Sequence, residues 1–182
     1  MLKIFSKAID VEASEFQCLH DHVMYDSWIV FNPDKKRFQR DITRDNKLIE
    51  KVLHFLTTKG LTRNRYFGGA VVLHSEKHCK KQYYHTDYDP DKLHNARYKP
   101  AGVIVALEND TKFMTPAKVY YLKKGDVLIF EGDIVHCGAS YTKPNTRIHI
   151  YLDVIDVKRE ENKTWLVSNV SNTKKRKHNI LF

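Results

Sequence analysis

Apolar residues in the first third of the chain recur with the spacing of an α-helix. They share one face of a stretch that begins at Asp45 or Asn46 and ends at Lys59: Leu48, Ile49, Val52, Leu53 and Leu56. Gly60 follows, and glycine readily adopts the left-handed conformation that ends many helices. A weaker pattern of the same period runs over residues 12–24. The chain is therefore predicted to begin with two helices.

From Tyr66 onward, short runs of β-branched and aromatic residues replace the helical spacing. Turn-forming residues separate these runs, and no helical pattern lies between them. This favours an antiparallel sandwich or barrel over alternating strands and helices. The predicted strands are Ala70–Leu73, Gln82–Asp87, Val103–Leu107, Ala117–Leu122, Val127–Phe130 and Arg147–Val157.

The last of these runs has two unlike faces, because side chains alternate along a strand. The apolar face is suited to pack against a helix, and it consists of Ile148, Ile150, Leu152 and Val154. The opposite face consists of Arg147, His149, Tyr151 and Asp153. A polar face that points into a barrel needs polar groups or a ligand beside it. We therefore expect a ligand to lie against this face.

A length of 182 residues suits one domain with one substantial core. We divide it into an N-terminal helical part (1–65), a β core (66–157) and a C-terminal extension with a basic tail (158–182). Hydrophobic residues make up 42% of the chain, which excludes a disordered protein. The predicted fold class is mainly β with N-terminal helices.

The formal net charge of +9 favours acidic or phosphate-rich partners. Part of this charge lies in Lys174–His178, which resembles a nuclear localisation run and equally fits a solvated terminus. No signal peptide or membrane span is predicted, since charges interrupt every apolar run. Three irregularly spaced cysteines do not form a disulfide framework, so we expect free thiols and an intracellular protein, cytoplasmic or nuclear.

A metal-binding pattern lies in the middle of the β region. His85 and Asp87 are two residues apart on an extended segment, so their side chains project to the same face. His136 follows the Val127–Phe130 run and its turn, and offers a third ligand. Two imidazoles and one carboxylate form the facial triad of non-haem iron(II) oxygenases, which leaves positions open for an oxidant and a co-substrate. These three residues are predicted to hold iron(II).

A candidate anchor for a co-substrate follows on the polar face of the last run. Arg147 comes eleven residues after His136. Its planar guanidinium can bind a carboxylate through two parallel hydrogen bonds, a geometry that lysine does not offer. Arg147 is therefore expected to bind the distal carboxylate of 2-oxoglutarate.

In the order of His85, Asp87, His136 and Arg147, the chain resembles the 2-oxoglutarate/iron(II) dioxygenases. The resemblance covers residues 66–157 and includes the strand entry Gly125–Phe130 before the distal histidine. It implies a double-stranded β-helix, or jelly-roll, core flanked by N-terminal helices. It also implies that 2-oxoglutarate and O2 are converted to succinate and carbon dioxide while a substrate is hydroxylated, or demethylated by way of hydroxylation. Ascorbate is then a candidate reductant.

The chain departs from this family pattern at two places. Many members have serine or threonine two residues after the arginine, where this chain has His149, and we assign His149 to the 2-oxoglutarate site. Nucleic-acid demethylases carry a second arginine six residues after the first, where this chain has Asp153, which argues against that branch. Some branches use a tyrosine to bind 2-oxoglutarate. Tyr83 and Tyr84 are both candidates, although one of the pair must face away.

The segment that follows the predicted metal strand, residues 88–100, shows no periodicity. A long loop at the mouth of a site often selects the substrate. Its basic and aromatic side chains suit a nucleic-acid strand as well as a solvated surface. The residues that we assign to this substrate lid are Tyr88, His94, Arg97 and Tyr98.

The leading functional prediction is a dioxygenase that hydroxylates a protein side chain or another macromolecular target. A hydroxylase or demethylase of nucleobases is one alternative, because the chain is basic. A non-enzymatic, cupin-like module that binds a small dicarboxylate or a metal is another. Open coordination positions favour catalysis, since a binding module gains nothing from keeping them. The sequence predicts no oligomeric state.

Overall fold

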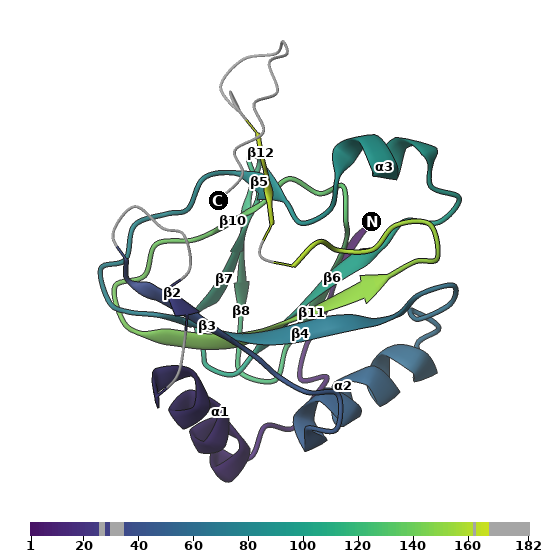
Figure 1. The fold of residues 1–182 in the computed structure, drawn as a ribbon. Helices are drawn as coiled ribbons and strands as arrows, with labels where there is room; N and C mark the ends of the chain where they lie inside the picture. Colours follow the sequence, from purple (N-terminus) through teal and green to yellow (C-terminus); the bar gives the residue numbers. More distant parts are fainter. Residues whose placement is uncertain (26–27, 30–34, 162, 168–182) are drawn as a thin grey trace.

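The computed structural model describes residues 1–25, 28–29, 35–161 and 163–167, and the predicted basic run Lys174–His178 lies outside these ranges. Figure 1 shows the arrangement of the helices and strands. In chain order these are β1 (Leu2–Phe5), α1 (Ala13–Tyr25), β2 (Trp28–Ile29), β3 (Arg37–Asp41), α2 (Lys47–Thr58), β4 (Tyr66–Ser75), β5 (His85–Thr86), α3 (Pro90–Asn95), β6 (Ala101–Ala106), β7 (Thr111–Met114), β8 (Val119–Leu122), β9 (Val127–Glu131), β10 (Cys137–Gly138), β11 (Asn145–Asp153) and β12 (Trp165–Leu166).

A large antiparallel sheet, in the order β1-β9-β6-β11-β4-β3-β2, forms the centre of the fold. Helices α1 and α2 lie against one of its faces, and the smaller sheets β10-β7-β8 and β12-β5 lie over the other (Figure 1). Strand β11 is central, because it pairs with β4 on one side and with β6 on the other. The prediction of a mainly β fold with N-terminal helices is confirmed.

Helix α2 begins and ends where the sequence predicts, and its apolar face packs against the large sheet. The Asn46 side chain accepts hydrogen bonds from the backbone N–H groups of Leu48 and Ile49, at 3.0 and 3.4 Å, and so caps the first turn. Gly60, just beyond the helix, has a φ of +68°, as expected of a helix stop. The buried face of α2 shares one apolar cluster with the predicted apolar face of β11: Leu48, Ile49, Val52, Leu56, Ile148, Ile150 and Leu152.

The opposite face of β11 is polar and equally buried, with the side chains of Arg147, His149, Tyr151 and Asp153. Between the large sheet and β10-β7-β8 lies a second apolar cluster, which includes Phe113 and Phe130. Both phenylalanine rings lie against that of His136, the candidate metal ligand. The fold therefore brings polar side chains into a space that is otherwise apolar.

Three predicted strands are shorter in the structure, and the one predicted over residues 117–122 is β8, which begins at Val119. The strand predicted over residues 82–87 is confined to β5, and the one predicted to reach Val157 ends with β11 at Asp153. Val154 and Val157 exchange two backbone hydrogen bonds of 3.1 Å, so the chain reverses before its apolar run ends. Val154 consequently leaves the helix-facing cluster and packs beside Leu93 and Val157.

The N-terminal part contains more strand than its helical spacing predicted. Strand β1 pairs with β9, and β3 pairs with β4, so both extend the large sheet. The sequence of β3 contains one apolar residue, Phe38, among charged and polar ones, and this left no alternating pattern to recognise. The predicted boundary at residue 65 therefore falls between strands of one sheet.

The segment predicted to lack regular structure, residues 88–100, contains the short helix α3. The Asp89 side chain accepts a hydrogen bond of 2.9 Å from the Asp91 N–H, and Pro90 occupies the first turn. Both features favour the start of a helix. Leu93 packs against Tyr88 and fixes the helix on the protein. Six residues are too few to produce a periodic pattern in the sequence.

Two predictions that concern the environment of the protein can be compared with the structure. All three cysteines are free, as predicted. No helix in the described ranges combines the length and the apolar character needed to cross a bilayer.

Replacing Leu56 by alanine tests the contact between α2 and the sheet. The side chain is wholly buried, and truncation of a buried leucine costs about 2–5 kcal/mol of folding free energy. Urea unfolding should show this loss for Leu56→Ala and a change below about 0.5 kcal/mol for His54→Ala on the exposed face of the helix. Equal effects of the two substitutions would contradict this packing.

Candidate metal centre

Two histidines distant in sequence are joined through their backbones. The N–H of His85 donates to the carbonyl of His136, and the N–H of His136 donates to the carbonyl of His85, both at 2.9 Å. Such a reciprocal pair fixes two residues directly opposite each other. The imidazole rings consequently lie with their centroids 4.7 Å apart.

The chain also fixes the orientation of each ring. Nδ1 of His85 lies 2.9 Å from the carbonyl oxygen of Tyr83, and Nδ1 of His136 lies 2.9 Å from that of Ile134. A carbonyl oxygen only accepts, so both Nδ1 atoms carry a proton, and Nε2 is the ring nitrogen that each histidine can offer to a metal. Burial, with the charge of His136, lowers the pKa of His85 to about 4, so this ring is neutral at physiological pH.

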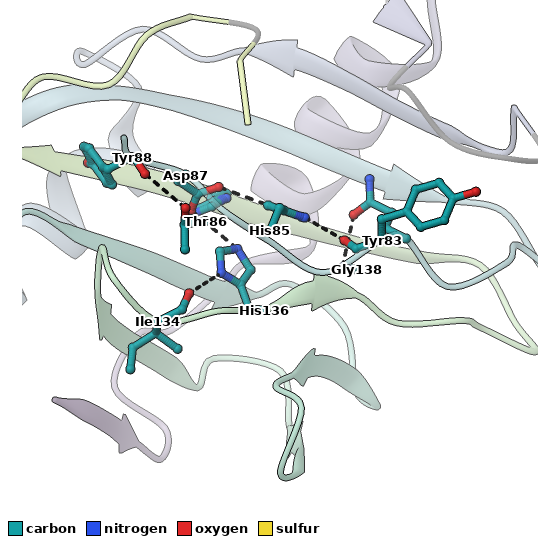
Figure 2. A network of polar contacts seen from close by, with 10 residues as sticks. Tyr83, His85, Thr86, Asp87, Tyr88, Ile134, His136 and Gly138 are labelled. Atoms are coloured by element: carbon teal, nitrogen blue, oxygen red, sulfur yellow. Dashed lines mark hydrogen bonds and ion pairs between the residues drawn. The ribbon is translucent and has the colours of Figure 1, made fainter. Parts of the chain in front are cut away.

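The Asp87 carboxylate lies against these Nε2 atoms (Figure 2). Oδ1 is 3.9 Å from Nε2 of His85, and Oδ2 is 3.4 Å from Nε2 of His136. Asp87 is 4% exposed, and its Oδ2 has no hydrogen-bond partner among the described residues. Burial opposes ionisation, but His136, His149, His85 and Arg159 together lower the pKa of Asp87.

The donor set fits a divalent metal ion. One ligand atom from each of His85, Asp87 and His136 lies within 4.8 Å of the others. Two imidazole nitrogens and one carboxylate oxygen suit iron(II) among other first-row metals. A buried carboxylate oxygen without a partner is costly, and a bound cation would remove that cost. The sequence prediction named the same three residues, and the structure brings them together.

His149 lies beside this cluster. Its Nε2 is 3.5 Å from Asp87 Oδ2, and this nitrogen also has no hydrogen-bond partner among the described residues. Burial lowers the pKa of His149 to about 3, so the ring is neutral. A buried imidazole thus occupies the position two residues after Arg147, where the sequence resemblance implied a hydroxyl side chain. The structure places His149, which the sequence analysis assigned to the 2-oxoglutarate site, beside the candidate metal ligand Asp87.

Arg147 is buried on the same face of β11. Its Nη1 donates to Ser75 Oγ at 3.1 Å, and its guanidinium lies 5.8 Å from the ring centroid of Tyr141. Within the described residues, no carboxylate forms an ion pair with Arg147. A buried cation in this situation favours an anionic ligand.

The two candidate tyrosines lie differently from one another. Tyr83 is 58% exposed, and Figure 2 shows its ring directed away from His85, Asp87 and His136. The Tyr84 hydroxyl donates to the carbonyl of Thr115 at 3.3 Å, and Lys81 lies over its ring. Neither hydroxyl contacts the three candidate ligands.

The predicted lid residues divide into one buried side chain and three outer ones. Tyr88 is wholly buried, and its hydroxyl donates to Asp153 Oδ1 at 3.0 Å. His94 is exposed on α3, and the Arg97 guanidinium lies over the ring of Tyr98. Tyr88 is therefore part of the protein interior beside the site. His94, Arg97 and Tyr98 lie at the surface, where they can contact a substrate.

Several residues that shape the site were missed by sequence analysis. Ser75 Oγ accepts hydrogen bonds from both Arg147 and Arg37, the latter at 2.8 Å. Arg37 Nη2 further donates to the carbonyls of Lys80 and Ala139, which ties β3 to segments beside the metal ligands. These contacts depend on the register of β3, β4 and β11, and no motif in the sequence predicts them.

Without bound metal, the protein is expected to lose stability as the pH falls from about 6.5 to about 4. Burial lowers the pKa of His74 and His85 to about 4 and that of His149 to about 3. In the unfolded chain each histidine takes up its proton at about pH 6.5. The unfolded state therefore binds more protons in this window. The free energy of unfolding decreases by about 1.4 kcal/mol for each histidine per unit by which the pH is lowered.

His74→Gln removes one of these three contributions without touching the candidate ligands. The slope of stability against pH should fall by about a third, as measured by urea unfolding with a chelator present. A slope identical to that of the unaltered protein would show that His74 is protonated in the folded state.

No protein-family model matches the chain, and no curated protein matches it in sequence. Solved structures do match. The carbocyclase SnoK, a non-haem α-ketoglutarate-dependent enzyme from nogalamycin biosynthesis, gives a TM-score of 0.66 at 11% identity, over 87% of this chain and 81% of SnoK.

Two further matches are of the same kind. HygX from Streptomyces hygroscopicus, solved with nickel and 2-oxoglutarate, gives a TM-score of 0.62 at 10% identity, over 85% of this chain and 83% of HygX. The viral collagen prolyl hydroxylase of Paramecium bursaria Chlorella virus-1, in its 2-oxoglutarate complex, gives a TM-score of 0.62 at 14% identity, over 85% of this chain and 96% of the hydroxylase. At such low identity the likeness concerns the fold, and the chain has the double-stranded β-helix fold found in 2-oxoglutarate/iron(II) oxygenases.

Proposed function

We propose that this protein is an iron(II)- and 2-oxoglutarate-dependent dioxygenase whose metal is held by His85, Asp87 and His136. The observation that carries the proposal is the buried Asp87 Oδ2, which has no hydrogen-bond partner in the described residues and faces histidine nitrogens. When bound, the iron supplies the activation of O2 and the oxidation of the substrate. Ascorbate is proposed as a reductant that keeps the metal in the iron(II) state.

Arg147 is proposed to hold the distal carboxylate of 2-oxoglutarate. Its guanidinium is buried, and Ser75 is its hydrogen-bond partner in the described residues. The planar fork leaves further N–H groups for a carboxylate, which accepts two parallel hydrogen bonds. His149 lies two residues along the same face, with its Nε2 3.5 Å from Asp87 Oδ2.

Aromatic packing holds one ligand in place and keeps water away from it. The ring of Phe113 stacks on that of His136 with centroids 5.1 Å apart, and the ring of Phe130 meets it edge-on at 4.8 Å. Both phenylalanines are buried. A ligand fixed by packing and by its backbone hydrogen bond needs little reorganisation when a metal binds.

The fold alone does not select a substrate. One similar structure is a collagen prolyl hydroxylase, whereas others contain hygromycin B or come from nogalamycin biosynthesis. For this chain we propose a protein side chain or another macromolecular target, supported by the positive net charge and the outer lid residues. Hydroxylation or demethylation of nucleobases is the alternative, and succinate formation stimulated by DNA or RNA but not by peptides would favour it.

Asp87→Ala tests the metal site directly. Removal of the carboxylate should lower the affinity for iron(II), or for cobalt(II) as a spectroscopic substitute, by about a hundredfold or more. Succinate formation from labelled 2-oxoglutarate should be lost in parallel. Lys124→Ala, which changes an exposed residue, is the matched control. Metal binding that is unchanged in Asp87→Ala would exclude this centre.

Arg147→Lys tests the anchor for 2-oxoglutarate. The charge is kept but the planar fork is lost, so KM for 2-oxoglutarate should rise by about tenfold to a hundredfold. Metal affinity should change little, because Arg147 is not among the metal ligands. Titration of 2-oxoglutarate into the cobalt-loaded protein measures the loss without turnover, and an unaltered affinity would assign the carboxylate to another residue.

A further inference from the structure

A second arginine lies near the candidate metal centre, and the proposed reaction assigns it no ligand. Arg159 follows the turn that ends β11, and its backbone N–H donates to Asp153 Oδ1 at 3.2 Å. The neighbouring Glu160 forms ion pairs with Lys92 of α3 and with Lys163. These contacts hold the segment against the body of the protein.

The Arg159 side chain turns toward the centre. Its guanidinium carbon lies 3.9 Å from the ring centroid of Tyr151, on the polar face of β11. That ring in turn meets the ring of His149 with centroids 4.2 Å apart, and His149 Nε2 lies 3.5 Å from Asp87. A continuous series of contacts thus leads from Arg159 to a candidate metal ligand.

The guanidinium edge of Arg159 is available for a ligand. Stacking on an aromatic ring uses the flat face of a guanidinium and leaves the N–H groups at its edge. In the described residues, the Arg159 side chain makes no hydrogen bond or ion pair, and the side chain is half-buried. Asp153 Oδ1 already accepts from Tyr88 and from the Arg159 backbone.

Part of β11 separates the two arginines, because Arg147 lies on this strand and Arg159 stacks on its residue Tyr151. Arg147 and Tyr151 are four residues apart on one face of β11, which places them about 13 Å apart. His149 lies between them. One anion-binding position is thus available on each side of His149, with Arg147 deeper and Arg159 nearer the surface.

We propose that Arg159, stacked on Tyr151, binds an anionic group of the substrate, a carboxylate or a phosphate, and so holds the carbon to be oxidised beside the centre. This inference rests on the proposed dioxygenase function. It gives the substrate a specific chemistry: an oxyanion a few bonds from the reactive carbon. The guanidinium edge would bind two of its oxygens in parallel.

Binding of simple anions tests this site without a known substrate. The full-length protein is loaded with cobalt(II) and saturating 2-oxoglutarate, so that Arg147 is occupied, and is then titrated with inorganic phosphate or with acetate. In ¹H–¹⁵N NMR spectra, the Nε–Hε signal of Arg159 is identified as the arginine signal that is missing in Arg159→Lys. This signal should shift when the anion is added. In Arg159→Ala the affinity for the preferred anion should fall by about tenfold or more.

Lys158→Ala is the control, because Lys158 is the exposed neighbour of Arg159 and the two substitutions remove the same charge. This variant should keep the anion affinity within about twofold. Arg159→Lys should show an intermediate loss, since it keeps the charge and loses the fork. Thermal unfolding checks that each variant is folded.

The outcomes separate this inference from the proposed function. Equal anion affinities in Arg159→Ala and in the unaltered protein, or no shift of the Arg159 signal with either anion, would overturn the inference. Failure of the unaltered protein to bind cobalt and 2-oxoglutarate in the first step would instead overturn the proposed function. Preference for phosphate or for acetate would identify which oxyanion the substrate carries.

Discussion

The reciprocal backbone hydrogen bonds between His85 and His136 are the contact on which the centre depends. They join β5 to the segment before β10, and both imidazoles project from that bridge. Each ring is then fixed by a carbonyl two residues earlier in the chain. The side chains that meet Asp87 are therefore oriented by main-chain geometry, which a change of neighbouring side chains alters little.

Burial of the polar face of β11 lowers the stability of the fold, but it provides groups that can bind a ligand. Arg147, His149 and Asp87 are buried, and atoms of the last two lack hydrogen-bond partners in the described chain. A core built for stability would have filled these positions with apolar side chains, as it does on the helix-facing side of the same strand. Buried groups of this kind are most often found where a ligand completes the site.

Local patterns in the sequence were sufficient for α2, for the faces of β11 and for the three candidate ligands. Each of these depends on a period of two or 3.6 residues, or on the spacing of a short motif. The shortness of β5, the strand β3 and the position of Arg159 depend instead on pairing between distant segments. Helix α3 was missed for another reason, because a capped helix of six residues has no period to detect.

Strand β12 pairs with β5, so the last described segment of the chain hydrogen-bonds to the strand that carries His85. The candidate ligands, β11 and this pairing come from widely separated parts of the sequence, and no short piece of the chain contains the centre. Contacts of such long range carry a loop-closure cost that slows folding, and each needs both of its segments to be present. The proposed metal would therefore bind only after nearly all of the described residues had been synthesised, and it would stabilise only chains in which these segments had already paired.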